Sequence, residues 1–246
     1  MHIRIIKTLL FITLLQLLSA CATLDAPPEP HDPWERLNRT MYGFNDKVDR
    51  AVLKPVASAY RFITPDVAEK GVDNFFSNLR EVKTILNDLL QFKLLQTLSD
   101  TGRLIVNSTI GIGGLFDVAQ HMGLEKHNED FGQTLGKWGV GQGPYLVLPF
   151  LGPSSVRDGT GLTVDYAVFP VRQIDDDATR NTLYLLDIIN TRAQLLEAGD
   201  IIDAAAYDPY IFLREAYLQR RKNLVHDGNP PPEPNGEEEY DIFSDD

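Results

Sequence analysis

Apolar residues recur every three or four positions along most of this chain, the spacing that places them on one face of an α-helix. Prolines and glycines divide the pattern into segments, which predict helices over 33–54, 65–78, 79–90, 94–105, 179–198 and 209–222. We expect Asp32 to cap the first helix, Pro55 to end or kink it, and Gly199 to stop the fifth. Each apolar stripe is predicted to pack in a core between helices, with contact to lipid as the alternative.

The segment from Gly111 to Gly161 breaks this pattern, because glycines cluster there and the helical spacing fades. Residues 139–144 (Gly-Val-Gly-Gln-Gly-Pro) predict a flexible turn, and the apolar run over 145–149 predicts a short extended segment. Residues 110–114 do not form a nucleotide-binding loop, since Phe116 stands where its last glycine would be. With no strand alternation elsewhere, the fold class is predicted to be all-α.

The N-terminus has a separate character. Arg4 and Lys7 precede an apolar run over 9–18, which is about half the length of a membrane-spanning helix. Leu-Ser-Ala-Cys at 18–21 is similar to a bacterial lipobox, so residues 1–20 are predicted to be a cleaved signal peptide and Cys21 the lipid-modified first residue. A secretory signal with a chance cysteine is the alternative, but it would leave an unpaired thiol in an oxidising compartment.

The remaining chain divides by composition. Residues 21–31 are rich in proline and predict an extended tether, residues 32–225 predict one helical domain, and residues 226–246 predict a disordered acidic tail. The formal net charge is −12, and the stretch 227–246 holds acidic residues but no lysine or arginine. Because phosphate backbones require a basic surface, nucleic acid is excluded as a partner.

Candidate catalytic and metal-binding groups are sparse. Residues 152–156 lack the closing glycine of the GxSxG nucleophile motif that a lipid esterase would carry. His121, His127, Glu129 and Asp130 have no metal-ligand spacing, so a polar loop is the better interpretation. The sequence therefore predicts neither an enzyme nor a metal or cofactor site.

Several ordered blocks resemble one family, the MlaA (VacJ) outer-membrane lipoproteins, over roughly residues 32–222. The longest block is 138–149, and the others lie at 32–39, 42–46, 53–57, 74–79, 113–119, 129–136, 191–196 and 208–210. Ala22, where some lipoproteins have aspartate, resembles an outer-membrane address. Phe92 is a departure, since the resemblance leads us to expect glycine there, and it leaves open whether a sharp turn separates the helices on either side.

The resemblance implies a ring-like helical domain that lies in the inner leaflet of the outer membrane, with a central amphipathic channel and a short Gly-rich hairpin. It implies a lipoprotein that removes mislocalised phospholipid from the outer leaflet and so maintains lipid asymmetry. The implied partners are phospholipid, a trimeric outer-membrane porin, and a soluble periplasmic carrier that returns the lipid to the inner membrane.

The candidate site residues follow from the same blocks. Phe44 and Asn45 are expected to be control points, although Phe44 is equally explained as core. Gly141, Gly143 and Pro144 match the family's flexible hairpin near the channel. The alternative is that they form a turn that only reverses the chain. Arg180 is the candidate cation for a lipid phosphate, and the alternative is that it is only a solvated helix residue. Two other functions remain open: an envelope scaffold that affects lipids indirectly through a porin, and a lipid hydrolase with an unrecognised site.

Overall fold

A computed structural model describes residues 29–231, and the regular structure there is almost entirely helical, which confirms the all-α prediction. The signal peptide, Cys21 and most of the predicted tether and tail lie outside the described residues. The elements in chain order are α2 (Glu35–Val48), the π-helical turn η1 (Asp49–Leu53), α3 (Lys54–Ile63), α4 (Asp66–Leu90), α5 (Leu94–Thr109), α6 (Val118–His121), α7 (Phe131–Lys137), β1 (Tyr145–Leu148), β2 (Gly152–Ser155), α8 (Val156–Val168), the 3-10 turn η2 (Pro170–Gln173), α9 (Asp177–Gln194), α10 (Leu196–Ala205) and α11 (Pro209–Val225).

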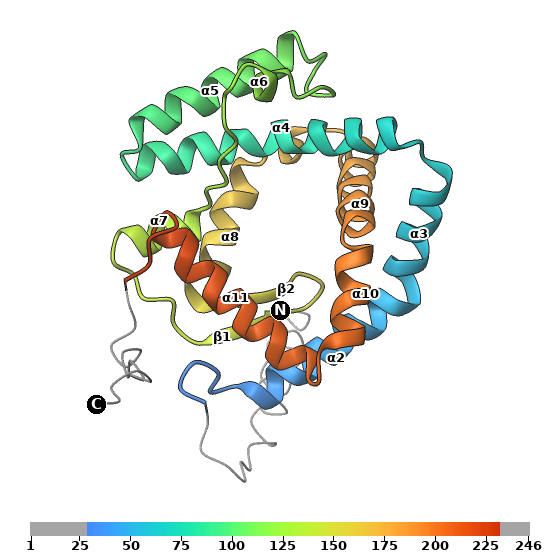
Figure 1. The fold of residues 1–246 in the computed structure, drawn as a ribbon, viewed down its shortest axis with the longest axis vertical. Coiled ribbons are helices and arrows are strands. Elements are labelled where there is room, and N and C mark those ends of the chain that lie inside the picture. The colour runs from blue at the N-terminus through green and yellow to red at the C-terminus, as the bar shows by residue number, and fades with distance from the viewer. Residues whose placement is uncertain (1–28, 232–246) are drawn as a thin grey trace, which may run out of the picture.

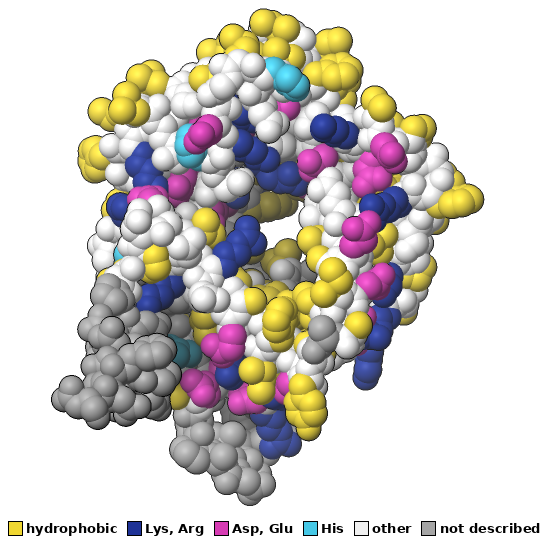
Figure 2. Space-filling model, in the orientation of Figure 1, with side chains coloured by type: hydrophobic (Ala, Val, Ile, Leu, Met, Phe, Trp, Pro, Cys, Tyr) yellow, Lys and Arg dark blue, Asp and Glu magenta, His cyan; other side chains and the backbone are white. Residues whose placement is uncertain are grey.

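These elements follow one another around an open centre (Figure 1). Helix α4 forms one side, α9 and α10 the next, with α3 packed outside α9, and α2, α11, α8 and the β1–β2 hairpin close the circuit. Helix α5 lies on the outer side of α4. The space-filling view in the same orientation is hollowed at the same place (Figure 2).

The first helix differs from the prediction at its start. Trp34 occupies the cap position without a side-chain hydrogen bond, so the expected cap at Asp32 is wrong. The Asp32 carboxylate is fully buried instead and accepts hydrogen bonds from Asn38, Tyr210 and Arg214. Because these partners come from two helices, tertiary packing outcompetes the local cap.

Pro55 kinks the helical segment, as the sequence predicts. The backbone widens into the π-helical turn η1 before it, and Pro55 falls in the first turn of α3, where a missing N–H costs least. The stop at Gly199 is wrong, because the break comes at Leu195 and Gly199 lies inside α10.

The glycine-rich region contains the single-turn helix α6, helix α7 and the start of α8, none of which the sequence pattern predicted. The Ser155 hydroxyl caps α8 by accepting a hydrogen bond from the Asp158 N–H at 3.1 Å. A Cβ added to Gly161 in α8 would lie 2.5 Å from the backbone nitrogen of Gly132 in α7. The glycines here therefore permit close helix contact, whereas their clustering in the sequence had indicated turns.

Burial is inverted relative to a water-soluble domain. Among the described residues, fully buried side chains are more often polar or charged than apolar. Helix α5 buries Asp100, Arg103 and Asn107 but exposes 85% of Leu95 and 69% of Leu98. The prediction that the α5 stripe packs in a core is therefore wrong, and its alternative, contact with lipid, fits the exposure.

Large apolar side chains gather at two corners of the molecule. Phe62, Ile63 and Val67 surround the α3–α4 junction, and Phe92 and Leu95 lie at the α4–α5 turn. Figure 2 shows apolar side chains around the periphery, including the edge formed by α5. Within residues 29–231, no helix has both the length and the hydropathy to cross a bilayer.

The α4–α5 turn is sharp even though glycine is absent. Phe92 adopts a left-handed backbone with φ of 60°, directly after the C-cap residue Gln91. This conformation costs an ordinary residue about 1–2 kcal/mol. A sharp turn therefore does separate the two helices, in a conformation that glycine would adopt without this strain.

Candidate functional site

The β1–β2 hairpin is the only sheet in the described part of the chain, and its turn is apolar. The strands pair in antiparallel register from Tyr145 opposite Ser155 to Leu148 opposite Gly152. Phe150 in the turn has a positive φ of 64° and is 70% exposed. An exposed aromatic residue in a strained turn is costly in water, so this turn suits an apolar surrounding.

Helix α2 holds this turn in place. Asn45 donates from Nδ2 to the Leu148 carbonyl at 2.9 Å and accepts at Oδ1 from the Phe150 N–H at 2.8 Å. The neighbouring Phe44 ring meets the Phe150 ring edge to face, with centroids 5.2 Å apart. Two residues that the sequence singled out therefore meet the hairpin turn directly, although about a hundred positions separate them.

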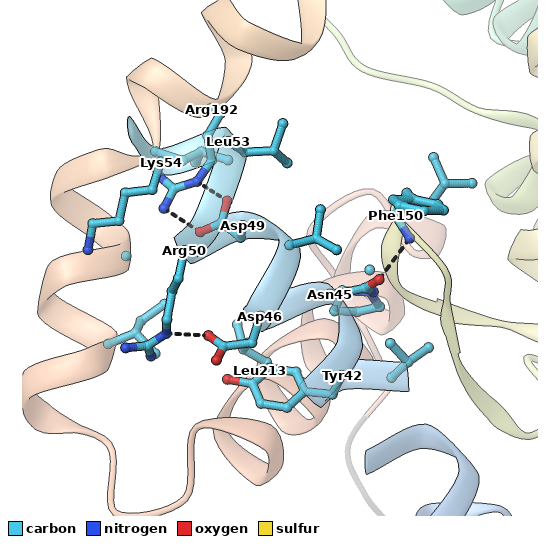
Figure 3. A pocket seen from close by; sticks show the side chains of 18 of the residues that line it. Tyr42, Asn45, Asp46, Asp49, Arg50, Leu53, Lys54, Phe150, Arg192 and Leu213 are labelled. Carbon is cyan, nitrogen blue, oxygen red and sulfur yellow. Dashed lines mark hydrogen bonds and ion pairs between the residues drawn. The ribbon is translucent and has the colours of Figure 1, made fainter. Parts of the chain in front are cut away.

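A pocket of about 450 Å³ opens between this turn, α2, η1 and α10 (Figure 3). That volume lies in the range of small-ligand pockets. Side chains from the hairpin turn, the end of α2, η1, the α9–α10 junction and α10 make its wall predominantly apolar. They include Val48, Leu53, Phe150, Leu151, Leu195 and Ile202. Phe150 and Leu151 were missed at the sequence level, where two apolar residues after Pro149 are the only signal.

Charged side chains also line this pocket, and they pair with one another. Arg192 binds Asp49 in a two-pronged contact, with Nε to Oδ1 at 2.6 Å and Nη2 to Oδ2 at 2.9 Å. Hydrogen bonding to Asp49 raises the pKa of Arg192 above its ordinary value, so its charge is permanent. Arg50 donates a single hydrogen bond to Asp46, from Nε to Oδ1 at 2.8 Å, and Figure 3 shows both pairs.

One nitrogen of Arg192 has no partner. Its Nη1 is buried and makes no hydrogen bond within the described residues. A buried unpaired donor on a charged group is costly, so an additional acceptor at this position would be favourable. Arg192 is thus the cation of this pocket best suited to an anionic group.

The other predicted site residues lie apart from this pocket. Gly141 lines a second cavity that runs along α11, and Gly143 adopts a left-handed φ of 68° just before β1. Pro144 accepts a hydrogen bond from the Val156 N–H at 3.1 Å, which ties the start of the hairpin to α8. Arg180 lies in the first turn of α9, where it donates to the Ile174 carbonyl at 2.8 Å, and it lines neither cavity.

Buried ion pairs fix the elements on which the hairpin rests. Arg221 of α11 contacts both Asp130 and Asp158, and Tyr217 donates to Asp158 at 2.6 Å. Burial alone would raise the pKa of Asp130, but the hydrogen bonds from Arg221 hold it well below the ordinary range. These carboxylates stay ionised, so α7, α8 and α11 remain joined across the neutral pH range.

Metal ligands do not converge anywhere in the described region: no group of three His, Cys, Asp or Glu side chains there could hold a metal ion. The polar clusters of residues 29–231 are ion pairs and hydrogen-bond networks between helices. The chemistry that the pocket supports is binding of an amphipathic molecule.

Comparison with known proteins identifies the family. The model of the MlaA lipoprotein family matches residues 30–224. The chain belongs to the MlaA lipoprotein family. It is 38% identical over 226 residues to the intermembrane phospholipid transport system lipoprotein MlaA of Escherichia coli (strain K12), which covers 89% of this chain and 88% of that protein.

Two further relatives extend the comparison. An uncharacterised protein of Rickettsia typhi is 35% identical over 198 residues, covering 80% of this chain and 79% of its own. A solved chain from work on the structural basis for maintenance of bacterial outer membrane lipid asymmetry superposes with a TM-score of 0.69. That chain is 37% identical, and the match covers 79% of this chain and 98% of the solved one. The MlaA fold thus extends over most of the described residues.

Proposed function

We propose that this chain removes mislocalised phospholipids from the outer leaflet of the outer membrane and hands them to a periplasmic carrier for return to the inner membrane. Its relatives in the MlaA family are intermembrane phospholipid transport lipoproteins. The observation that carries the proposal is the apolar pocket beside the hairpin turn, with paired charges among its lining residues.

The energetics favour such a site. A phospholipid with two chains of about fifteen methylenes loses on the order of 24 kcal/mol if both chains enter water, at about 0.8 kcal/mol per methylene. A few contacts cannot offset that, so the chains need a continuous apolar path and the headgroup a polar one. The pocket wall supplies the first around Leu53 and Leu151, and Arg50 and Arg192 supply the second.

Within this proposal the headgroup phosphate binds Arg192. The unpaired Nη1 supplies a donor, while Asp49 holds the guanidinium in position through its other two nitrogens. Arg180, the candidate from the sequence, would have to act at another stage of transfer, because its guanidinium is engaged by the Ile174 carbonyl and Asp177.

The hairpin turn is proposed as the movable wall of the passage. Phe44 and Asn45 hold it against α2. Gly141, Gly143 and Pro144 lie in the segment that leads into the hairpin. A Cβ added to Gly141 would meet no atom within 4 Å, which supports a segment with room to move. The ring around the open centre would then form the amphipathic channel, with passage controlled by the hairpin (Figure 1).

The location proposed for the domain is the inner leaflet of the outer membrane, anchored by acyl chains on Cys21. Exposed apolar side chains at the α3–α4 and α4–α5 corners would contact lipid, because water would disfavour them. A trimeric porin and a soluble periplasmic lipid carrier are the proposed partners. No energy source is invoked, since the sequence carries no nucleotide-binding loop.

A matched pair of substitutions tests the function. Leu151 and Ile201 are both 66% exposed, but only Leu151 lines the pocket. In cells that lack the native gene, Leu151→Glu should leave phospholipid in the outer leaflet, because a carboxylate blocks the apolar path. Ile201→Glu should restore asymmetry as the unaltered chain does. Equal restoration by both variants would refute the pocket as the lipid path.

Two measurements separate the alternatives. If the chain is a scaffold that acts through a porin, Leu151→Glu should fail only when porin association is also lost, so co-purification of the porin is scored in parallel. If the chain is a hydrolase, purified protein should release free fatty acid from phospholipid vesicles, which mass spectrometry detects. We expect intact lipid and retained porin.

A further inference from the structure

A second cavity, of about 1540 Å³, shares no lining residue with the pocket beside the hairpin turn, and its lining is positively charged. It runs along α11 and is closed on the other side by the glycine-rich segment that includes Gly141. Arg157, Arg220 and Lys222 line this groove. Its one acidic lining residue within the described region is Glu215, which already binds Arg214 at 2.8 Å.

The chain itself turns back into this groove after α11. Asp227 and Gly228 both adopt positive φ, 52° and 83°, and the Gly228 N–H donates back to the Asn223 carbonyl at 3.0 Å. The reversal carries Pro230 and Pro231 to the groove, where both are lining residues. The backbone therefore heads back along α11 instead of leaving the molecule in the direction of the helix.

The first carboxylate after α11 is already bound to the body of the protein. Asp227 pairs with Lys93 at the α4–α5 turn and with Lys137 of α7, the latter at 2.8 Å. These contacts hold the pKa of Asp227 below its ordinary value, although burial opposes the shift. The start of the acidic stretch is thus fixed at the end of a basic groove.

We propose that the acidic segment 232–246 is the occupant of this groove, running back along α11 with its carboxylates against Arg220, Lys222 and Arg157. The segment contains Glu233, Glu237, Glu238, Glu239 and further aspartates but no lysine or arginine. Extended, it spans about 50 Å, whereas α11 is about 25 Å long, so it reaches the whole groove. Its charge is opposite to that of the groove.

Occupancy would have a consequence for the glycine-rich wall. Gly139, Val140 and Gly141 line the groove on the side facing α11. A bound acidic segment would restrain this wall and exclude any acidic partner from the same surface. The groove shares no lining residue with the pocket beside the hairpin turn, so this inference stands or falls independently of the proposed function.

Disulfide formation in the purified, detergent-solubilised chain tests the proposal. Gln219→Cys and Glu238→Cys are introduced together with Cys21→Ala, and the rate of intramolecular pairing is measured, since pairing requires Cα atoms within about 7 Å. The rate should fall roughly tenfold when Arg220→Glu and Lys222→Glu reverse the groove charge. It should fall similarly in about 1 M salt, which screens exposed charges.

The control is Lys70→Glu, an exposed position of α4 that lines neither cavity. This substitution changes the net charge by as much as each of the two groove substitutions does, and it should leave the rate of disulfide formation unaltered. Circular dichroism confirms that each variant is folded. If the two cysteines form the disulfide as fast in the charge-reversed variant as in the unaltered groove, their contact reflects tethering alone and the proposal is overturned.

Discussion

The side-chain amides of Asn38 and Asn45, seven positions apart in α2, form hydrogen bonds with the backbone at two successive points along the hairpin. Asn38 donates to the Tyr145 carbonyl at 3.0 Å and accepts from the Val147 N–H at 2.9 Å, and Asn45 repeats the contact at Leu148 and Phe150. Two helical turns rise about 10.5 Å, and three strand residues advance about 10 Å. The helix thus acts as an additional strand at the edge of β1.

Removing either amide should loosen the hairpin at a defined point. Asn45→Ala should lower the free energy of unfolding by about 1–2 kcal/mol, since two hydrogen bonds to backbone groups are lost. Hydrogen exchange should speed up at the Phe150 amide for Asn45→Ala and at the Val147 amide for Asn38→Ala. Asn74→Ala, which removes one hydrogen bond to Leu115 at 3.0 Å, should leave both amides unchanged. If the Val147 and Phe150 amides exchanged at the same rates in all three variants, these asparagine hydrogen bonds would not be what holds the hairpin.

Asp32 should be the most sensitive carboxylate near the domain's start. It is fully buried, and its carboxylate accepts hydrogen bonds from Asn38, Tyr210 and Arg214. Asp32→Ala leaves a buried guanidinium and a hydroxyl without their acceptor, so thermal or denaturant unfolding should show a loss of about 3–5 kcal/mol. Glu35→Ala removes a half-exposed acceptor of Arg39 and should cost less than about 1 kcal/mol. Equal losses would show that the buried network is not what fixes α2.

Replacing Phe92 with glycine should stabilise the isolated domain. The left-handed φ of 60° strains phenylalanine, and relief should raise the free energy of unfolding in detergent by about 1 kcal/mol. Leu95→Gly is the matched control, because Leu95 is equally exposed at 85% but lies in α5, where glycine should cost about 1 kcal/mol. A loss of stability in both variants would show that the Phe92 side chain outweighs the strain.

Stability should fall as the pH rises from about 4 toward 8. Burial, helped by the neighbouring Asp100, raises the pKa of Asp88 to about 8, and burial raises the pKa of Glu81 to about 7. Between the ordinary and the raised pKa, the folded state binds more protons than the unfolded one, so stability is greatest below pH 4 for these groups and is lost up to their folded pKa.

Asp88→Asn isolates this effect. The variant should show a shallower decline of unfolding free energy between pH 5 and 8, with each removed proton worth at most about 1.4 kcal/mol per pH unit. Asp175→Asn, in an exposed loop, should keep the slope of the unaltered chain. A slope that Asp88→Asn leaves intact would place the titrating group elsewhere.

The pattern of the sequence predicted most helices and an extended segment over 145–149, where β1 spans Tyr145–Leu148, because helical and extended periodicity are local properties. It misjudged the burial of α5, since an apolar stripe has the same spacing whether it faces a core or lipid. It also missed α7 and α8, where Gly132 and Gly161 permit two backbones to approach and so conceal the helical signal. Phe44 and Asn45 entered as candidates only through the family blocks.

The sequence by itself determined the helical class, the family and the positions of Phe44, Asn45 and the glycine-rich segment, since each depends on short-range spacing or on ordered blocks of residues. The tertiary structure decided which of these meet. It placed Asn45 against Phe150, separated Gly141 from the pocket beside the hairpin turn, and brought Arg192 to Asp49. Contacts across more than a hundred positions depend on how helices close around the centre, and no local pattern of apolar and polar residues encodes that closure.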